Sequence, residues 1–293
     1  MALVESNGIT IEYHEQGSGE PLLLVMGLGG QLIDWPQGLV DEFVERGFRV
    51  ISYDNRDSGL STEFTSVPPT KGELAKAVML RRRLRSEYLL SDMANDAVGL
   101  LDALGIANAH VVGMSMGGMI AQMIAIEHPD RVRSLTSIMS TPGPYVGRPK
   151  WAVIRKMMRR QIPTPETAVD QSIEAFRDVC GPTFDADEFR QLAQRSVDRS
   201  FRPNGTSRQL AAIIASPDRT ARLQRLRMPA LVIHGMVDPL VQPSGGYATA
   251  KAIPGARLVM FNDMGHDLPR TRWAEIADEV AALSARAPQP VGV

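Results

Sequence analysis

Cysteine is nearly absent from this sequence of 293 residues, in which Cys180 is the single example. One cysteine excludes an intrachain disulfide and any metal site built from several thiolates. The first residues, Met-Ala-Leu-Val-Glu-Ser, have neither a basic start nor a long apolar run, so we expect no secretory signal peptide. Both observations favour a reducing compartment, and we predict a cytoplasmic protein.

An excess of charge of one sign is also lacking, and so are long apolar runs. Lys and Arg number 32 against 33 Asp and Glu, which leaves a formal net charge of -1 and no overall positive field to collect phosphates. The longest apolar stretch, residues 22–28, is far shorter than the roughly 18 residues that a membrane-spanning helix needs. We therefore expect no nucleic-acid partner and no membrane insertion, while a homodimer stays open.

Short apolar runs alternate with longer helical patterns along most of the chain, as buried parallel strands alternate with crossover helices. Residues 9–14 instead alternate apolar and polar side chains, which predicts an edge strand with one face in solvent. Together the runs predict an α/β fold with a mostly parallel central sheet and helices on both faces. The expected buried strands are residues 21–26, 49–53, 109–112, 135–139, 230–234 and 257–261.

Two helical patterns and one long interruption complete the expected architecture. Ser91 as a cap and Gly105 as a terminator predict a helix between them, and the apolar run 116–128 predicts a buried helix that ends before Pro129. From residue 142 to 217 the chain is helical and charged, with no strand run. We therefore predict a core over 1–141, an inserted helical cap over 142–217 and a second part of the core over 218–293.

The strongest chemical motif is Gly-Met-Ser-Met-Gly at 113–117, which directly follows an expected strand and opens the buried helix. This is a G-x-S-x-G nucleophile elbow in its strand–turn–helix context. Ser115 is the candidate nucleophile, because a tight turn exposes its hydroxyl at the carboxyl edge of the sheet. Side chains at Gly113 and Gly117 would collide with the neighbouring strand and helix. The alternative is a glycine-rich structural turn.

A serine hydroxyl needs a base to take its proton, and the base needs an acid to orient it. His266 is the candidate base, because it lies in a loop directly after the last expected strand. Asp238 follows the strand 230–234 and is the candidate acid, with Asp263 as its main rival. The other histidines sit in or at the ends of expected strands and helices: His14, His110, His128 and His234.

An oxyanion formed during attack on a carbonyl needs N–H donors that are already in place. One donor is expected to be the backbone N–H of Met116, the residue after the nucleophile. The other is expected from the loop after strand 21–26, where Leu28 is the first choice and Gly29 the second. Otherwise, these glycines serve only to make a tight turn.

These segments together resemble the α/β-hydrolase superfamily over essentially the whole chain. The order Ser115, Asp238, His266 matches that fold, residues 53–61 are similar to its D-x-R-G-x-G-x-S turn, and 234–238 to its acid loop. Within the superfamily, the segments 25–30, 53–61 and 264–269 are most similar to the small carboxylesterases related to aclacinomycin methylesterase. The resemblance implies a serine hydrolase that needs no cofactor and no metal.

The chain departs from that pattern in three places. Met26 stands where most relatives have a histidine that braces the oxyanion loop, and Asp57 replaces the usual glycine of the Asp54 turn. Residues 71–87 add a basic helical stretch, and whether it overlies the site stays open. Its arginines include Arg81, Arg82, Arg83 and Arg85.

The predicted cap should determine the substrate. Trp151, Ile154 and Met158 share one helical face, which predicts either the core of the cap or the lining of an acyl or alcohol pocket. Residues 143–216 carry 12 Lys or Arg and 8 Asp or Glu, an excess of 4 positive charges. A solvated basic face explains this excess, and an anionic substrate is the alternative.

The leading hypothesis is a serine hydrolase that cleaves a small or medium carboxylic ester through an acyl-enzyme. Haloperoxidase-like perhydrolysis, carbon–carbon bond hydrolysis and lactone opening could use the same residues, and fold alone does not choose among them. A hydrolase-like receptor that binds a ligand without turnover is the hypothesis from another class.

Overall fold

A single sheet of eight strands runs through the residues that the computed structural model describes, 1–80 and 84–287. Its order is β1-β2-β4-β3-β5-β6-β7-β8, and the neighbours from β4 to β8 pair in parallel. This arrangement confirms the predicted α/β fold. The strands are β1 (Ala2–Ser6), β2 (Ile9–Gln16), β3 (Glu20–Val25), β4 (Phe48–Tyr53), β5 (Ala109–Met114), β6 (Val132–Ile138), β7 (Ala230–Gly235) and β8 (Arg257–Phe261).

The prediction of an edge strand over residues 9–14 is wrong. β1 pairs antiparallel with β2 on the outside, and β2 pairs antiparallel with β4 on the inside. The alternating pattern of β2 is real, because its first residues point alternately to the core and away from it, but β1 covers its free edge. β1 is five residues long, and its apolar residues Ala2, Leu3 and Val4 are consecutive and do not alternate with polar ones, so the sequence gives no strand pattern there.

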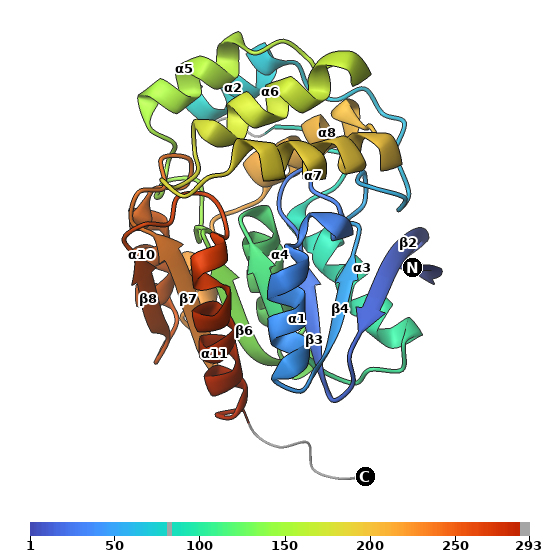
Figure 1. The fold of residues 1–293 in the computed structure, drawn as a ribbon, viewed down its shortest axis with the longest axis vertical. Coiled ribbons are helices and arrows are strands. Elements are labelled where there is room, and N and C mark those ends of the chain that lie inside the picture. The colour runs from blue at the N-terminus through green and yellow to red at the C-terminus, as the bar shows by residue number, and fades with distance from the viewer. Residues whose placement is uncertain (81–83, 288–293) are drawn as a thin grey trace.

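Helices cover both faces of the sheet (Figure 1). α1 (Gln37–Glu45) and α11 (Trp273–Ser284) pack on the face that receives Leu22 and Leu24, while the other face receives Leu23 and Val25. Successive residues of β3 thus enter two separate apolar clusters, as the period of a strand requires. The helices of the second face are α3 (Leu90–Ala103), α4 (Met116–Glu127), α9 (Thr220–Leu223) and α10 (Pro243–Ala252).

The two helices that the sequence predicts are both present and lie on this second face, with one change. α4 is buried from Met116 to Ala125 and ends before Pro129, as its apolar sequence predicts. α3 begins at Leu90 instead of following Ser91, and its first turn is closed by the Asp92 carboxylate, which accepts the N–H of Leu89 at 2.7 Å. Ser91 therefore lies inside the helix, and the predicted cap is wrong by two residues.

A helical layer lies beyond the carboxyl ends of the parallel strands, at the top of Figure 1. It contains the cap helices, a name that we use for α5 (Trp151–Arg159), α6 (Pro165–Arg177), α7 (Ala186–Arg199) and α8 (Pro203–Ala215). A further helix, α2 (Lys71–Leu80), comes from the loop after β4 and packs against α8. Within the stretch 71–87, residues 71–80 are helical and residues 84–87 are not, while Arg81, Arg82 and Arg83 lie outside the described residues.

Three short 3-10 helices complete the described secondary structure, at Leu32–Asp34, Pro129–Arg131 and Arg270–Arg272. No helix in the described ranges is long and apolar enough to cross a membrane.

Candidate active site

Ser115 occupies a strained turn between β5 and α4, with φ of 55° and ψ of -120°. A non-glycine residue with positive φ is uncommon and costs about 1–3 kcal/mol, so the surrounding structure must hold it in place. Added Cβ atoms at Gly113 and Gly117 would lie 2.1 Å from the Gly117 carbonyl oxygen and 1.9 Å from the Val25 carbonyl oxygen. The elbow therefore requires both glycines, as the sequence predicts.

The side chains of Ser115, His266 and Asp238 form one chain of hydrogen bonds. Ser115 Oγ lies 2.9 Å from His266 Nε2, and His266 Nδ1 lies 2.7 Å from Asp238 Oδ2. An ionised carboxylate only accepts hydrogen bonds, so Nδ1 carries the imidazole proton and Nε2 is free to accept from the serine hydroxyl. The structure thus brings together the three residues that the sequence analysis singled out.

Asp238 is held in place by the turn that follows β7. Its side chain is fully buried, and its Oδ1 accepts the backbone N–H groups of Leu240 and Val241 at 2.8 and 2.9 Å. His234 closes this turn, because its Nε2 donates to the Val241 carbonyl oxygen over 2.7 Å. Burial lowers the pKa of His234, which keeps that ring neutral beside the acid.

The remaining candidates do not reach the serine. Asp263 pairs with Arg272, with both nitrogen–oxygen distances at 3.1 Å, and the hydrogen bonds from Arg272 lower its pKa. His110 contacts Ser134 and Glu20 within the sheet, and His128 contacts Asn95 at the far end of α4. His14 lies in β2, and His234 lies near the end of β7.

The loop after β3 lies directly against the nucleophile. An added Cβ at Gly27 would come within 3.3 Å of Ser115 Cβ, so this glycine lets the loop approach closely. Across the described chain, no protein acceptor takes the backbone N–H of Leu28 or Met116. Gly29, the second choice as donor, already gives its N–H to Gln209 Oε1 at 2.8 Å. Of the two expected choices in this loop, only Leu28 keeps its N–H available.

Gln209, on α8, is a site residue that sequence reasoning missed. Its side chain is fully buried and bridges two core segments, because Nε2 also donates to the Arg56 carbonyl oxygen at 2.7 Å. The loop is further fixed by Asn55, which donates to the Met26 carbonyl oxygen at 3.0 Å. These contacts brace the loop where Met26 replaces the histidine of the family pattern. The sequence held one signal for this role. A helix that packs against the core buries mostly apolar side chains, so a glutamine on its buried face must be there to form hydrogen bonds.

Asp57, the second departure from the family pattern, ties the cap helices to the core. Its φ of 67° explains why glycine is usual at this position. The Asp57 carboxylate receives two hydrogen bonds from Arg208 on α8, at 2.9 and 2.7 Å, and one from the Tyr88 hydroxyl at 2.6 Å. The bonds to Asp57 raise the pKa of Arg208. A second cap arginine, Arg199 on α7, pairs with the carboxylate of Asp54 at 2.7 Å.

The segment between α6 and α7 encloses the histidine loop. The N–H of His266 donates to the Val179 carbonyl oxygen at 2.8 Å, and Asp267 Oδ1 accepts the N–H of Gly181 at 2.9 Å. An added Cβ at Gly265 would lie 2.4 Å from the carbonyl carbon of Cys180, so the two segments touch through backbone. Burial raises the pKa of the Cys180 thiol, which leaves it protonated.

The predicted substrate-binding face of α5 points outward. Trp151 is 74% exposed and Met158 is 49% exposed, while the buried residue of the helix is Val153. The prediction that Trp151 and Met158 form the core of the cap is therefore wrong, and Ile154 is only half-buried. The helix turns its apolar stripe away from the protein, and the described contacts do not test a role in substrate binding.

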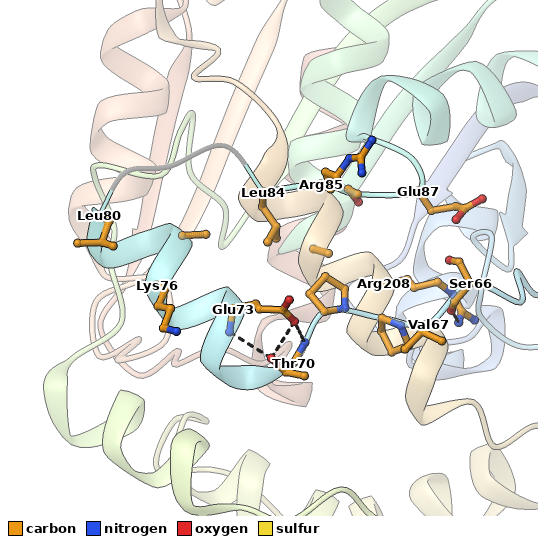
Figure 2. Close-up of a pocket in the computed structure, with 15 residues that line it drawn as sticks. Ser66, Val67, Thr70, Glu73, Lys76, Leu80, Leu84, Arg85, Glu87 and Arg208 are labelled. Atoms are coloured by element: carbon orange, nitrogen blue, oxygen red, sulfur yellow. Dashed lines mark hydrogen bonds between the residues drawn. The ribbon is translucent and has the colours of Figure 1, made fainter.

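The basic stretch borders a separate depression of about 700 Å³ between α2 and α8 (Figure 2). Its wall includes Lys76 of α2, Arg85 and Arg208, but none of the three residues of the hydrogen-bonded chain. Figure 2 shows Thr70 and Glu73 joined at the start of α2 and Leu80 at the opposite end of that helix. In the described residues, no group of three or more His, Cys, Asp or Glu side chains is placed to hold a metal ion.

Comparison with known proteins places this geometry in a family. A family model for the alpha/beta hydrolase fold matches residues 20–269. The chain is 29% identical to rhodomycin D methylesterase DnrP of Streptomyces peucetius, over 89% of this chain and 90% of that protein. It is also 29% identical to 2-hydroxymuconate semialdehyde hydrolase of Pseudomonas putida, over 92% and 86%. Among solved structures, an esterase from Exiguobacterium antarcticum superposes with a TM-score of 0.74 at 19% identity, covering 97% of this chain and 98% of that one.

Proposed function

Because the chain belongs to the α/β-hydrolase fold family, we propose that it is a serine hydrolase that cleaves a small or medium carboxylic ester. One observation carries this proposal: Ser115, His266 and Asp238 form an unbroken chain of hydrogen bonds, with distances of 2.9 and 2.7 Å. The chain ends at a serine on a strained turn at the N-terminus of α4, where the helix favours developing negative charge.

In the proposed reaction, Ser115 Oγ attacks the ester carbonyl carbon while its proton moves to His266 Nε2. Asp238 accepts the Nδ1–H of His266, which holds the ring in the correct tautomer and stabilises the imidazolium that forms. The same proton then passes to the departing alcohol oxygen, leaving an acyl group on Ser115. Water, deprotonated by His266, attacks this acyl-enzyme; His266 then returns the proton to Ser115 Oγ as the bond to the acyl group breaks and the acid is released.

The carbonyl oxygen becomes negative at both tetrahedral stages, and the N–H groups of Leu28 and Met116 are the proposed donors to it. Both groups are left without a protein acceptor in the described chain, as donors reserved for a substrate would be. The close contact of Gly27 with Ser115 keeps the Leu28 loop beside the reacting oxygen. Gln209 takes the neighbouring Gly29 N–H and so fixes which N–H of the loop stays available.

The substrate class rests on relatives, and two classes are in contention. The 29% identity to a rhodomycin D methylesterase favours an ester, and we adopt that class. The equal identity to 2-hydroxymuconate semialdehyde hydrolase favours carbon–carbon bond hydrolysis as the second candidate. We also propose that 142–217 acts as a cap over the core and that the enzyme works in the cytoplasm on a small-molecule ester.

Labelling by a fluorophosphonate probe tests the nucleophile. We expect covalent labelling of the wild type, none of Ser115→Ala, and full labelling of Ser244→Ala, which removes an exposed hydroxyl. Labelling that persists in Ser115→Ala would refute the proposal. A panel of methyl esters and vinylogous diketones, run on the same preparation, then separates ester cleavage from carbon–carbon cleavage. A protein that binds esters but is neither labelled nor active would be a receptor instead.

A further inference from the structure

The outward face of α5 carries an apolar stripe that the rest of the described protein does not cover. Trp151, Met158 and Ile162 are 74%, 49% and 69% exposed. Trp151 and Met158 are two turns apart on the helix, so they share a face, and Ile162 follows shortly after the helix ends. Val153, the buried residue of α5, points the other way. Exposed apolar side chains gathered on one face mark a surface that meets something apolar.

The charge around this stripe has one sign. Residues 148–165 contain no Asp or Glu, but they contain Arg148, Lys150, Arg155, Lys156, Arg159 and Arg160. Asp178 pairs with Lys156 and Arg160. Lys150, Arg155 and Arg159 are exposed and have no acidic partner within the described ranges. Arg155 lies one turn from Trp151, so a cation sits between the apolar side chains.

The stripe is also well placed to meet a large, flat partner. Figure 1 shows α5 at the upper end of the helical layer, away from the sheet, with α2 behind it. The Lys71 ammonium of α2 donates to the Arg160 carbonyl oxygen, which joins α2 to the end of the stripe. The last turn of α2 adds three more exposed apolar residues: Val78, Met79 and Leu80.

We propose that α5 docks this protein on the surface of a membrane that contains anionic phospholipids. Tryptophan prefers the boundary between headgroups and acyl chains, and methionine and isoleucine side chains can enter the acyl region beneath. The long side chains of Arg155 and Arg159 keep their guanidinium groups at the level of the phosphates, where each meets negative charge. This docking is independent of ester hydrolysis, because α5 contributes none of the residues of the hydrogen-bonded chain.

A second copy of the chain fits this face less well. Two stripes packed face to face would bring Lys150, Arg155 and Arg159 of one copy against the same cations of the other. No acidic side chain between residues 148 and 165 could relieve that repulsion. An anionic bilayer supplies both the negative charge and the apolar layer that the stripe requires.

Co-sedimentation with vesicles tests the proposal on the full-length protein. We expect binding to vesicles of phosphatidylcholine with about 30% phosphatidylglycerol, weaker binding to pure phosphatidylcholine, and a loss of binding between about 50 and 300 mM salt as charges are screened. Trp151→Ser combined with Met158→Ser, and Arg155→Gln combined with Arg159→Gln, should each weaken binding by about tenfold or more. The matched control is Tyr247→Ser, which removes an aromatic side chain on α10 that is 62% exposed.

Each variant must first unfold at the same temperature as the wild type and be labelled by the fluorophosphonate probe to the same extent. A variant that passes both checks is folded, so any loss of vesicle binding comes from the docking face. Absence of binding to the anionic vesicles would overturn the proposal, as would binding that neither pair of substitutions weakens. Sedimentation velocity supplies the competing outcome: a dimer that dissociates in the Trp151→Ser, Met158→Ser variant would assign this face to a second copy instead.

Discussion

Arg208 on α8 holds both carboxylate oxygens of Asp57, with distances of 2.9 Å from Nε to Oδ2 and 2.7 Å from Nη2 to Oδ1. Both side chains are buried, at 4% and 0% exposure. A bidentate pair between an arginine and a carboxylate is both strong and geometrically specific. The pair therefore fixes α8, and with it Gln209, at one position on the turn that follows β4.

Removal of the arginine should destabilise the whole molecule. Arg208→Met leaves Asp57 buried with its charge uncompensated, and breaking such a pair costs about 3–5 kcal/mol. We expect a loss of that size in the free energy of unfolding, measured by urea denaturation. Arg190→Met is the control, because it breaks an exposed ion pair with Asp170, which is worth about 1 kcal/mol or less. Equal effects of the two substitutions would show that α8 is not held through Asp57.

Gln209 should affect the rate of the proposed reaction more than the affinity for substrate. Gln209→Met keeps the length of the side chain but frees the Gly29 N–H and loosens the loop that carries Leu28. Since a lost oxyanion donor costs about 100-fold or more in kcat, we expect a misplaced one to cost about tenfold, with little change in KM. Steady-state kinetics measure this split.

Two further variants show whether the effect on kcat comes from the Gly29 contact. Gln209→Glu retains an acceptor for the Gly29 N–H and should recover part of the activity. Gln194→Met, which removes an exposed glutamine on α7, should behave as wild type. A parallel rise in KM with unchanged kcat in Gln209→Met would assign Gln209 to substrate binding instead.

The sequence was sufficient for the features that depend on local patterns. Glycines are required at 113 and 117 because backbone atoms of the neighbouring strand and helix come too close to leave room for a side chain. Any sequence that forms this turn around Ser115 must therefore contain them. The strands after β2 were predicted because buried parallel strands need continuous apolar runs, and β8 was predicted to the residue. His266 and Asp238 follow such strands, so their meeting at one edge of the sheet could be inferred.

Features that depend on contacts between distant segments could not be predicted. The apolar spacing of Trp151 and Met158 is the same whether the helix faces inward or outward, and only the packing of Val153 decides the direction. The Asp57–Arg208 pair joins residues 151 positions apart, and the sequence around either residue does not indicate which residue it pairs with. β1 was missed because it is short and its apolar residues do not alternate with polar ones, and its place is fixed by its ladder with β2.

His110 should make stability depend on pH in the mildly acidic range. Burial, the largest cause, and the nearby charge of Arg133 lower the pKa of His110 in the folded protein, although Glu20 opposes them. The unfolded chain takes up this proton near the ordinary value of about 6.5, whereas the folded protein does not until lower pH. The stability that the fold gains by keeping His110 neutral is therefore fully present above a pH of about 6.5. It is lost as the pH falls toward the pKa of His110 in the folded protein.

Comparison of wild type with His110→Gln isolates this contribution. The variant lacks the titrating ring, so the difference in free energy of unfolding between the two proteins should narrow between about pH 7.5 and 5.5, by at most about 1.4 kcal/mol per pH unit. Urea denaturation at each pH gives the difference, in which effects of other groups cancel. A difference that widens on acidification would mean that the fold favours the charged ring.

Asp238→Asn should nearly abolish the proposed activity while it leaves the fold intact. Oδ1 of Asp238 is fixed by the N–H groups of Leu240 and Val241, so the amide oxygen of the variant takes that position and its NH₂ group faces His266. The ring must then accept at Nδ1 and carry its proton on Nε2, which can no longer take the proton of Ser115. By analogy with serine proteases, we expect kcat to fall by about a thousandfold or more.

Asp263→Asn is the matched control, since it makes the same chemical change at the rival acid. Asp263 is engaged with Arg272 at 3.1 Å, so its substitution should leave kcat within about tenfold of wild type and change the free energy of unfolding little. Fluorophosphonate labelling rates give an independent measure, because they report the activation of Ser115 before any acyl-enzyme is hydrolysed. Retention of activity in Asp238→Asn with its collapse in Asp263→Asn would reassign the acid, since the partner of His266 in solution would then be Asp263.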